Sequence, residues 1–125
     1  MITRLNEGET SSKDIFDLSR AMEVVDGNKE LFKDISKMFL EGLAGNLAII
    51  KDAIAKSDAY ALERAAHSLK GSIGNFGAKR SFDAAYRLEK MGKEGKMDET
   101  KEAFNELEKE LALLETELNR ALKEM

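Results

Sequence analysis

The spacing of apolar residues between positions 28 and 56 constrains the fold more than any other feature. They recur at steps of three and four residues, which places them along one face of an α-helix rather than in the alternating pattern of a strand. Asn28 can cap this helix, which we expect to run to about Lys56. The apolar set comprises Leu31, Phe32, Ile35, Met38, Phe39, Leu43, Leu47, Ile50, Ala53 and Ile54.

A helix is predicted on each side of this long one. Asp14 or Asp17 can cap a short helix before it, and Gly27 is placed to end that helix in the left-handed conformation glycine adopts easily. After it, Asp58 can cap a third helix, which we expect to stop near Gly77 for the same reason.

Two more helices follow. One runs from about Lys79 to Met91 and buries Phe82, Ala85 and Leu88, and a loop covers residues 92–98. The last helix begins near Asp98 and continues to the end of the chain. Its apolar residues follow a heptad pattern, which is typical of helical bundles. They are Phe104, Leu107, Leu111, Leu114, Leu118, Ala121 and Met125.

These elements predict an all-α fold. The chain contains no proline, so nothing breaks the long helices. Short connections favour antiparallel neighbours. We therefore predict an antiparallel four-helix bundle over residues 13–125, with a short additional N-terminal capping helix, and a flexible tail or linker over residues 1–12.

The composition excludes several classes of function. There is no cysteine, which rules out disulfides and thiolate metal sites. The net charge of −4 argues against nucleic-acid binding. No apolar run is long enough to span a membrane, and the first residues do not form a signal peptide. We expect a cytoplasmic monomer that makes no membrane contact and holds no metal or cofactor of its own.

His67, the only histidine in the chain, falls on the exposed face of the third predicted helix. At about 100° per residue, the apolar positions of this helix centre on Leu69, and His67 points roughly 160° away from them. The periodicity therefore argues against a buried structural role, and the alternative to a functional role is an ordinary surface histidine. The apolar positions are Leu62, Ala65, Ala66, Leu69, Ile73 and Phe76.

Two glycines lie on the same face as this histidine. Gly71 and Gly74 follow His67 at one and two helical turns, although a glycine inside a helix costs about 1 kcal/mol relative to alanine. We interpret them as keeping the surface low so that another protein can approach. Gly77 has a different interpretation, because a glycine there ends the helix.

Basic residues are concentrated around the histidine. Between Glu63 and Arg80 the chain carries Arg64, Lys70, Lys79 and Arg80 and only one acid, in a protein that is acidic as a whole. Such a patch is suited to an acidic partner or a phosphoryl group. We predict Arg64, Gly71, Gly74, Lys79 and Arg80 as docking residues.

Among the reactions open to an exposed histidine, phosphoryl transfer fits this segment best. One histidine without cysteine is a poor transition-metal site, and nothing marks an oxyanion hole or a nucleotide-binding loop. An imidazole with the ordinary pKa of about 6.5 is largely neutral at pH 7, so its ring nitrogen is a free nucleophile. Lys70, one turn further along, is placed to neutralise phosphoryl charge.

The stretch AHSLKGSIGNFGA resembles the phosphorylation motif of histidine-containing phosphotransfer (HPt) domains of two-component phosphorelays. The match includes His67, Leu69, Lys70, Gly71, Asn75, Gly77 and Ala78, and the resemblance extends over residues 14 to 122, including the segment LEK at 88–90.

This resemblance implies a phosphoryl carrier without kinase activity of its own. His67 would accept phosphate from a receiver-domain aspartate and pass it to another receiver. Lys70 would lie beside the phosphoryl group, and Gly71 would let the receiver approach. Any Mg²⁺ would belong to the receiver domain. The chain would be either a free protein or a part of a hybrid sensor histidine kinase.

Two alternatives remain open at this point. The first is the phosphoacceptor domain of a chemotaxis-type histidine kinase, which a separate kinase domain phosphorylates from ATP; the donor that labels His67 distinguishes it. The second is a purely structural helix-association module, which would dimerise through the heptad pattern of the last helix.

Overall fold

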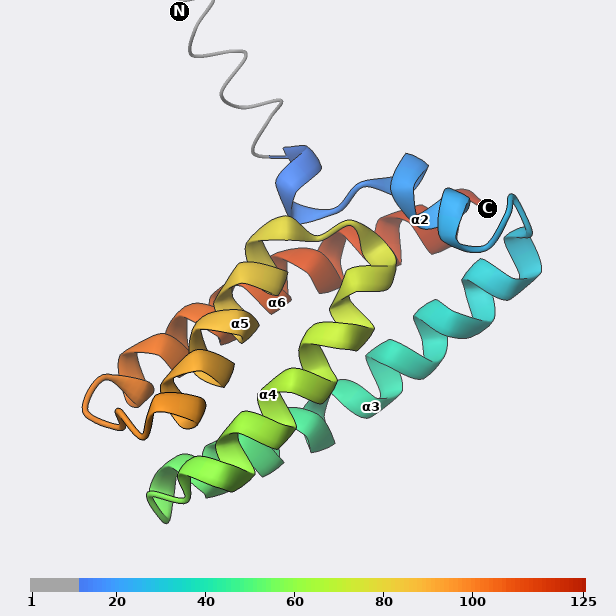
Figure 1. The fold of residues 1–125 in the computed structure, drawn as a ribbon. Coiled ribbons are helices and arrows are strands. Elements are labelled where there is room, and N and C mark those ends of the chain that lie inside the picture. Colours follow the sequence, from blue (N-terminus) through green and yellow to red (C-terminus); the bar gives the residue numbers. More distant parts are fainter. Residues whose placement is uncertain (1–11) are drawn as a thin grey trace, which may run out of the picture.

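The computed structural model describes residues 12–125, and within this range it contains helices and no strand. A helical turn over residues 12–15 leads into α2, and α3 to α6 then lie alongside one another as an antiparallel bundle with α2 at one end (Figure 1). The predicted fold class is therefore confirmed. The predicted tail lies outside the described residues except for Ser12. The elements are α2 (Leu18–Val24), α3 (Lys29–Ala55), α4 (Ala59–Ile73), the 3₁₀-helix η1 (Gly74–Phe76), α5 (Lys79–Glu94) and α6 (Thr100–Glu124).

Side-chain caps fix where the first three of these helices begin. The carboxylate of Asp17 accepts a hydrogen bond from the N–H of Arg20 at α2. The side-chain oxygens of Asn28 and Asp58 accept hydrogen bonds from backbone N–H groups in the first turns of α3 and α4, each at 3.0 Å. Each bond satisfies a backbone donor that has no partner within its helix. Asn28 and Asp58 are the predicted caps, and Asp17 rather than Asp14 caps α2.

The end of α5 differs from the prediction. We placed it near Met91, but α5 continues to Glu94 and ends at Gly95, whose φ is +70°. The predicted loop 92–98 is accordingly shorter. Gly92 is buried inside the helix, where a Cβ atom would lie 2.6 Å from the backbone nitrogen of Glu63 on α4. The glycine that indicated a loop instead allows α4 and α5 to pack closely.

The core lies between the four long helices and leaves one face of α4 free. Leu62, Ala66, Leu69 and Ile73 of α4 are all buried. They pack with large apolar side chains of α3, α5 and α6, among them Phe32, Phe39, Ile50, Leu88, Leu107, Leu111, Leu114 and Leu118. Burial of this apolar surface is the main favourable term in folding. Because it fixes the rotation of α4, it also fixes which residues of α4 face outward.

The short helix η1 that follows α4 is anchored to the residues just before α2. The N–H of Asp17 donates to the carbonyl of Phe76 in η1 at 3.1 Å. Gly77 follows with a φ of +59°, and a Cβ atom there would lie 2.9 Å from that of Asp17. A larger residue would meet both strain and a clash, so Gly77 has the structural role that the sequence predicts.

Candidate functional site

His67 lies on the outer face of α4, as its position in the helical periodicity predicts. Its side chain is 68% exposed, while Ala66 and Leu69 on either side of it in the sequence are buried. An imidazole in this position contributes little to packing and is accessible to another protein.

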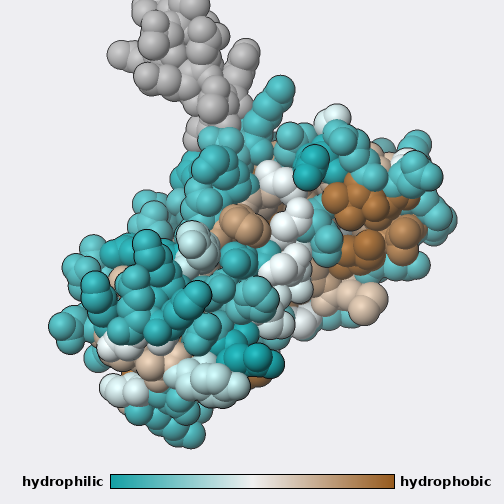
Figure 2. Space-filling model, in the orientation of Figure 1, coloured by the Kyte–Doolittle hydropathy of each residue, from teal (hydrophilic) through white to brown (hydrophobic). Residues whose placement is uncertain are grey.

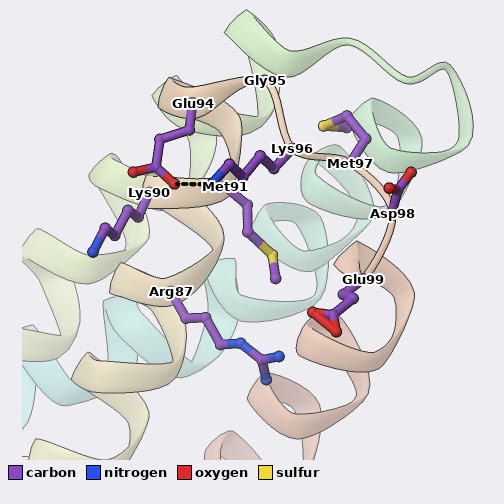
Figure 3. Close-up of a pocket in the computed structure, with 9 residues that line it drawn as sticks. All are labelled: Arg87, Lys90, Met91, Glu94, Gly95, Lys96, Met97, Asp98 and Glu99. Carbon is purple, nitrogen blue, oxygen red and sulfur yellow. Dashed lines mark ion pairs between the residues drawn. The ribbon is translucent and has the colours of Figure 1, made fainter.

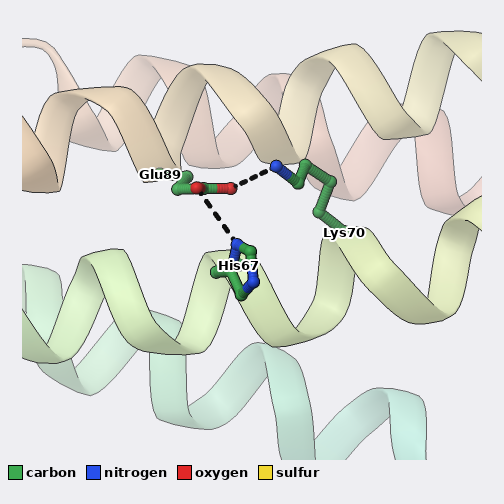
Figure 4. Close-up of polar contacts among 3 residues, drawn as sticks. All are labelled: His67, Lys70 and Glu89. Carbon is green, nitrogen blue, oxygen red and sulfur yellow. Dashed lines mark hydrogen bonds and ion pairs between the residues drawn. The ribbon is translucent and has the colours of Figure 1, made fainter.

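The polar partner of His67 comes from the neighbouring helix. Glu89 on α5 places Oε2 3.1 Å from Nδ1 of His67 and Oε1 2.8 Å from Nζ of Lys70 (Figure 4). The side chain of Glu89 is only 15% exposed and lies between α4 and α5 (Figure 4). One acid thus connects the two residues that the sequence predicts to be catalytic.

This contact decides which ring nitrogen is free. An ionised carboxylate can only accept hydrogen bonds, so Nδ1 of His67 carries the proton and donates it to Glu89. In the neutral ring, Nε2 then has the unshared electron pair. The geometry therefore holds the imidazole with one nitrogen bound to the protein and the other available as a nucleophile.

The surroundings of Glu89 favour its ionised form. Burial raises the pKa of its carboxyl, but the hydrogen bonds and charges of Lys70 and His67 outweigh this effect and lower the pKa below its ordinary value. Glu89 is therefore charged at neutral pH, as its role as acceptor for Nδ1–H requires.

Three of the four residues of the predicted basic patch have acidic partners. Lys70 pairs with Glu89, and Lys79 pairs with Asp83 at 2.7 Å on the same helix. Arg80 reaches across to α6, where its guanidinium binds the buried Glu110 at 2.9 and 3.1 Å. These three acids lie outside residues 63–80, the segment in which the charges predict a basic patch. The local positive charge is therefore smaller than the sequence indicates, because neighbouring helices supply acids of their own.

The two glycines on the face of His67 lie at the surface. Gly71 is exposed, and a Cβ atom built on it would meet nothing within 4 Å. Gly74 is also exposed, at the point where α4 gives way to η1, and a Cβ atom there would touch only the ring of Phe82 at 3.8 Å. Neither glycine is required by internal packing. Arg64, the remaining predicted docking residue, is exposed on α4.

Glu89 is the site residue that the sequence alone did not identify. It follows Ala85 by four positions and Phe82 by seven, so it continues the apolar face of its helix with an acid. A charged residue on an apolar helix face needs a partner of opposite charge or a hydrogen-bond donor. Its position on that face is therefore the sequence signal that could have identified Glu89. Its partners, however, lie 22 and 19 positions away, and only the packing of α5 on α4 brings them together.

Some other features of the described residues bear on what the chain can bind. A hollow of about 630 Å³ lies between the end of α5 and the start of α6, but its lining mixes acids and bases and includes none of His67, Lys70 and Glu89 (Figure 3). Nowhere in residues 12–125 do three or more histidine, aspartate or glutamate side chains gather as metal ligands would. No helix in this range is long and apolar enough to cross a membrane.

The comparisons with known proteins agree with this geometry. The family model of the Hpt domain matches residues 34–117. The histidine-containing phosphotransfer protein B (HptB) of Pseudomonas aeruginosa PAO1 has a similar structure, with a TM-score of 0.82, 20% identity, and coverage of 88% of this chain and 96% of that one. The HPT domain of a hybrid histidine kinase from Shewanella is also similar, with a TM-score of 0.78, 18% identity, and coverage of 90% and 97%. No curated protein matches the chain.

The family match covers more than half of the chain and includes His67, Lys70 and Glu89. The chain therefore belongs to the Hpt domain family, and its role is histidine phosphotransfer in a phosphorelay.

Proposed function

We propose that this domain accepts a phosphoryl group on Nε2 of His67 from the aspartyl phosphate of one receiver domain and passes it to the aspartate of another. The observation that carries the proposal is the contact between Nδ1 of His67 and Glu89, because it leaves Nε2 unprotonated on an exposed ring. The chain acts as a carrier and supplies no kinase activity.

The transfer balances without a proton leaving the ring. The electron pair on Nε2 attacks phosphorus, and the bond between phosphorus and the aspartate oxygen breaks, returning its electrons to the carboxylate. The ring of His67 then carries a positive charge with Nδ1–H intact, and the ionised Glu89 at 3.1 Å offsets that charge. The return step is the reverse: an acceptor aspartate attacks phosphorus and Nε2 recovers its electron pair.

Lys70 has two possible partners during this cycle. In the structure its ammonium binds Glu89, one helical turn from His67. Its flexible side chain can turn toward a phosphoryl group on Nε2 and neutralise part of that charge. Glu89 would keep its bond to Nδ1 while Lys70 exchanges one anionic partner for another.

We propose that a receiver domain docks on the surface beside His67. A groove of about 340 Å³ lies between α3 and the segment formed by the end of α4 and η1, and Ser72 and Asn75 line it together with apolar side chains of α3. Figure 2 shows apolar surface over the end of the bundle where α2 and the first half of α3 lie. We place the receiver over Arg64, Gly71, Gly74 and this groove. The groove is lined by Ile35, Met38, Phe39, Asn46, Ser72, Asn75 and Phe76.

The partner would supply the groups that this chain does not. A Mg²⁺ ion held by the receiver would neutralise the phosphoryl oxygens, and this chain would contribute His67 and Lys70. Because Lys79 and Arg80 already bind Asp83 and Glu110, we expect shape and apolar contact to contribute more to docking than net charge. We expect the domain to function as a monomer.

The test is to incubate the chain with receiver domains from the same genome that carry radiolabelled aspartyl phosphate. Label should move to His67 in the wild type and should not appear in His67→Gln. A second incubation supplies ATP and an isolated histidine-kinase catalytic domain. Labelling only in this second incubation would replace the proposal with the chemotaxis-type alternative, and sedimentation as a dimer without labelling from either donor would favour a structural module.

A further inference from the structure

Lys70 is held more tightly than a surface lysine ordinarily is. Its side chain is only 17% exposed, and its ammonium lies 2.8 Å from Oε1 of Glu89. The same ammonium lies 4.9 Å from the ring centre of Tyr86 and 5.6 Å from that of Phe82. Both distances are within the range in which a cation is attracted to an aromatic face.

Tyr86 gains little from this position by burial. It is 48% exposed, whereas Phe82 is partly buried and packs against the core. Here the ring of Tyr86 lies over Lys70, the lysine that binds Glu89. The ammonium of Lys70 is closer to the ring of Tyr86 than to that of Phe82.

The order of contacts along α4 and α5 connects this ring to His67. Because the helices are antiparallel, residues three positions later on α4 meet residues three positions earlier on α5. His67 meets Glu89, and Lys70 meets Tyr86 one turn further along. Glu89 is bound through one oxygen to Lys70 and through the other to His67, so the place of the ammonium fixes the rotation of the carboxylate.

We propose that Tyr86 is a positioning residue for the phosphoacceptor. Its ring holds the ammonium of Lys70 against Glu89, and the carboxylate then holds the Nδ1–H form of the His67 ring. This inference rests on the proposed function, since it concerns the readiness of the same Nε2. Tyr86 itself touches neither the histidine ring nor a phosphoryl group in this account.

The test measures the protonation of the ring directly. In the full chain labelled with ¹⁵N at histidine, NMR at a pH where the ring is neutral gives the ratio of the Nδ1–H to the Nε2–H form. We compare the wild type with Tyr86→Leu, which keeps apolar volume without a π-face, and with Tyr86→Phe, which keeps the ring. We repeat Tyr86→Leu in a Lys70→Met background.

We expect Tyr86→Leu to lower the ratio about two- to fivefold, the range expected for a partly exposed cation–π contact. Tyr86→Phe should keep the ratio at its wild-type value. Tyr86→Leu should not change the ratio further when Lys70 is already methionine. Phosphorylation by phosphoramidate should slow in Tyr86→Leu in proportion to the fraction of rings that lose the Nδ1–H form, which is a smaller factor than the change in the ratio while that form predominates.

Each contrary result overturns the inference. An unchanged ratio in Tyr86→Leu would show that the ring does not act on His67. An equal change in the Lys70→Met background would show that it does not act through Lys70. Loss of the cooperative melt in Tyr86→Leu would show that the ring is structural. The ratio needs no phosphoryl donor, so failure of the wild type to accept phosphate from any receiver would count against the proposed function alone.

Discussion

Nδ1 of His67 and Oε2 of Glu89 lie 3.1 Å apart, although the two residues are 22 positions apart in the sequence. The contact makes the imidazole part of a two-helix site rather than an isolated surface residue. The two ring nitrogens therefore differ: Nδ1 is bound within the protein, which holds the ring in place, whereas Nε2 is left free as a nucleophile.

The first prediction concerns His67 itself. His67→Gln should abolish phosphoryl acceptance and change the free energy of unfolding by no more than about 0.5 kcal/mol, since an exposed side chain contributes little packing. Denaturant unfolding checks the second part. A large loss of stability would mean that the ring contributes to the fold.

The second prediction concerns the charge on Glu89. Glu89→Gln keeps the size of the side chain but replaces a charge-assisted hydrogen bond with a neutral one, a loss of about 1 kcal/mol. Acceptance from a receiver should therefore slow about fivefold. Glu89→Leu, which removes the acceptor altogether, should slow it further. Single-turnover transfer measures both rates, and equal rates in all three proteins would show that Glu89 plays no part in the reaction.

The third prediction follows from the lowered pKa of Glu89. A carboxyl whose pKa is lower in the folded state stabilises the fold at pH values above its unfolded pKa. That contribution is lost as the pH falls through the folded pKa. At pH 7 the wild type should therefore be more stable than Glu89→Gln. Unfolding curves between pH 7 and pH 3 should show the difference shrinking below about 4.3, the ordinary pKa of glutamate. A difference that grows on acidification would contradict the direction of the shift.

The fold and the exposed position of His67 followed from local patterns, whereas the contacts around His67 did not. Helical periodicity placed His67 outside because the core residues of α4 recur regularly, and polar caps marked where α3 and α4 begin. Glu89 could not be paired with His67 in this way, because that contact depends on how two helices pack. For the same reason a count of charges along the chain did not show that Arg80 binds an acid on α6.

The fourth prediction separates Arg80 from Lys79. Glu110 is buried, and Arg80→Ala would remove the guanidinium that binds both of its oxygens, so the domain should lose about 2 kcal/mol of stability. Lys79→Ala, the matched control, removes an exposed ion pair on one helix and should leave stability almost unchanged. Thermal unfolding distinguishes them. If Arg80→Ala keeps its stability and instead slows transfer from a receiver, the docking role predicted from the sequence is correct.

The fifth prediction compares two helical glycines, Gly92 and Gly71. Gly92 is tightly packed against another helix, whereas Gly71 is open to solvent. A Cβ atom at Gly92 would lie 2.6 Å from the backbone of Glu63, so Gly92→Ala must push α4 and α5 apart. Overpacking of this kind costs about 1–3 kcal/mol. It should also disturb the contact between Glu89 and His67, which is the next one along the same pair of helices. Lower stability together with slower acceptance from every donor is the expected result.

At Gly71 the same reasoning gives the opposite sign. Nothing lies within 4 Å of the position of a Cβ atom, so Gly71→Gln places a better helix former on an open surface. Stability should rise by up to about 1 kcal/mol. The new side chain lies one turn from His67, where a receiver must approach, and a displacement of about 1 Å can slow transfer a hundredfold. Transfer from a receiver should therefore fall sharply, while phosphorylation by phosphoramidate, which needs no docking surface, should be nearly unchanged. If the variant is more stable and still accepts phosphate from receivers at the wild-type rate, Gly71 does not serve to clear the surface for a partner.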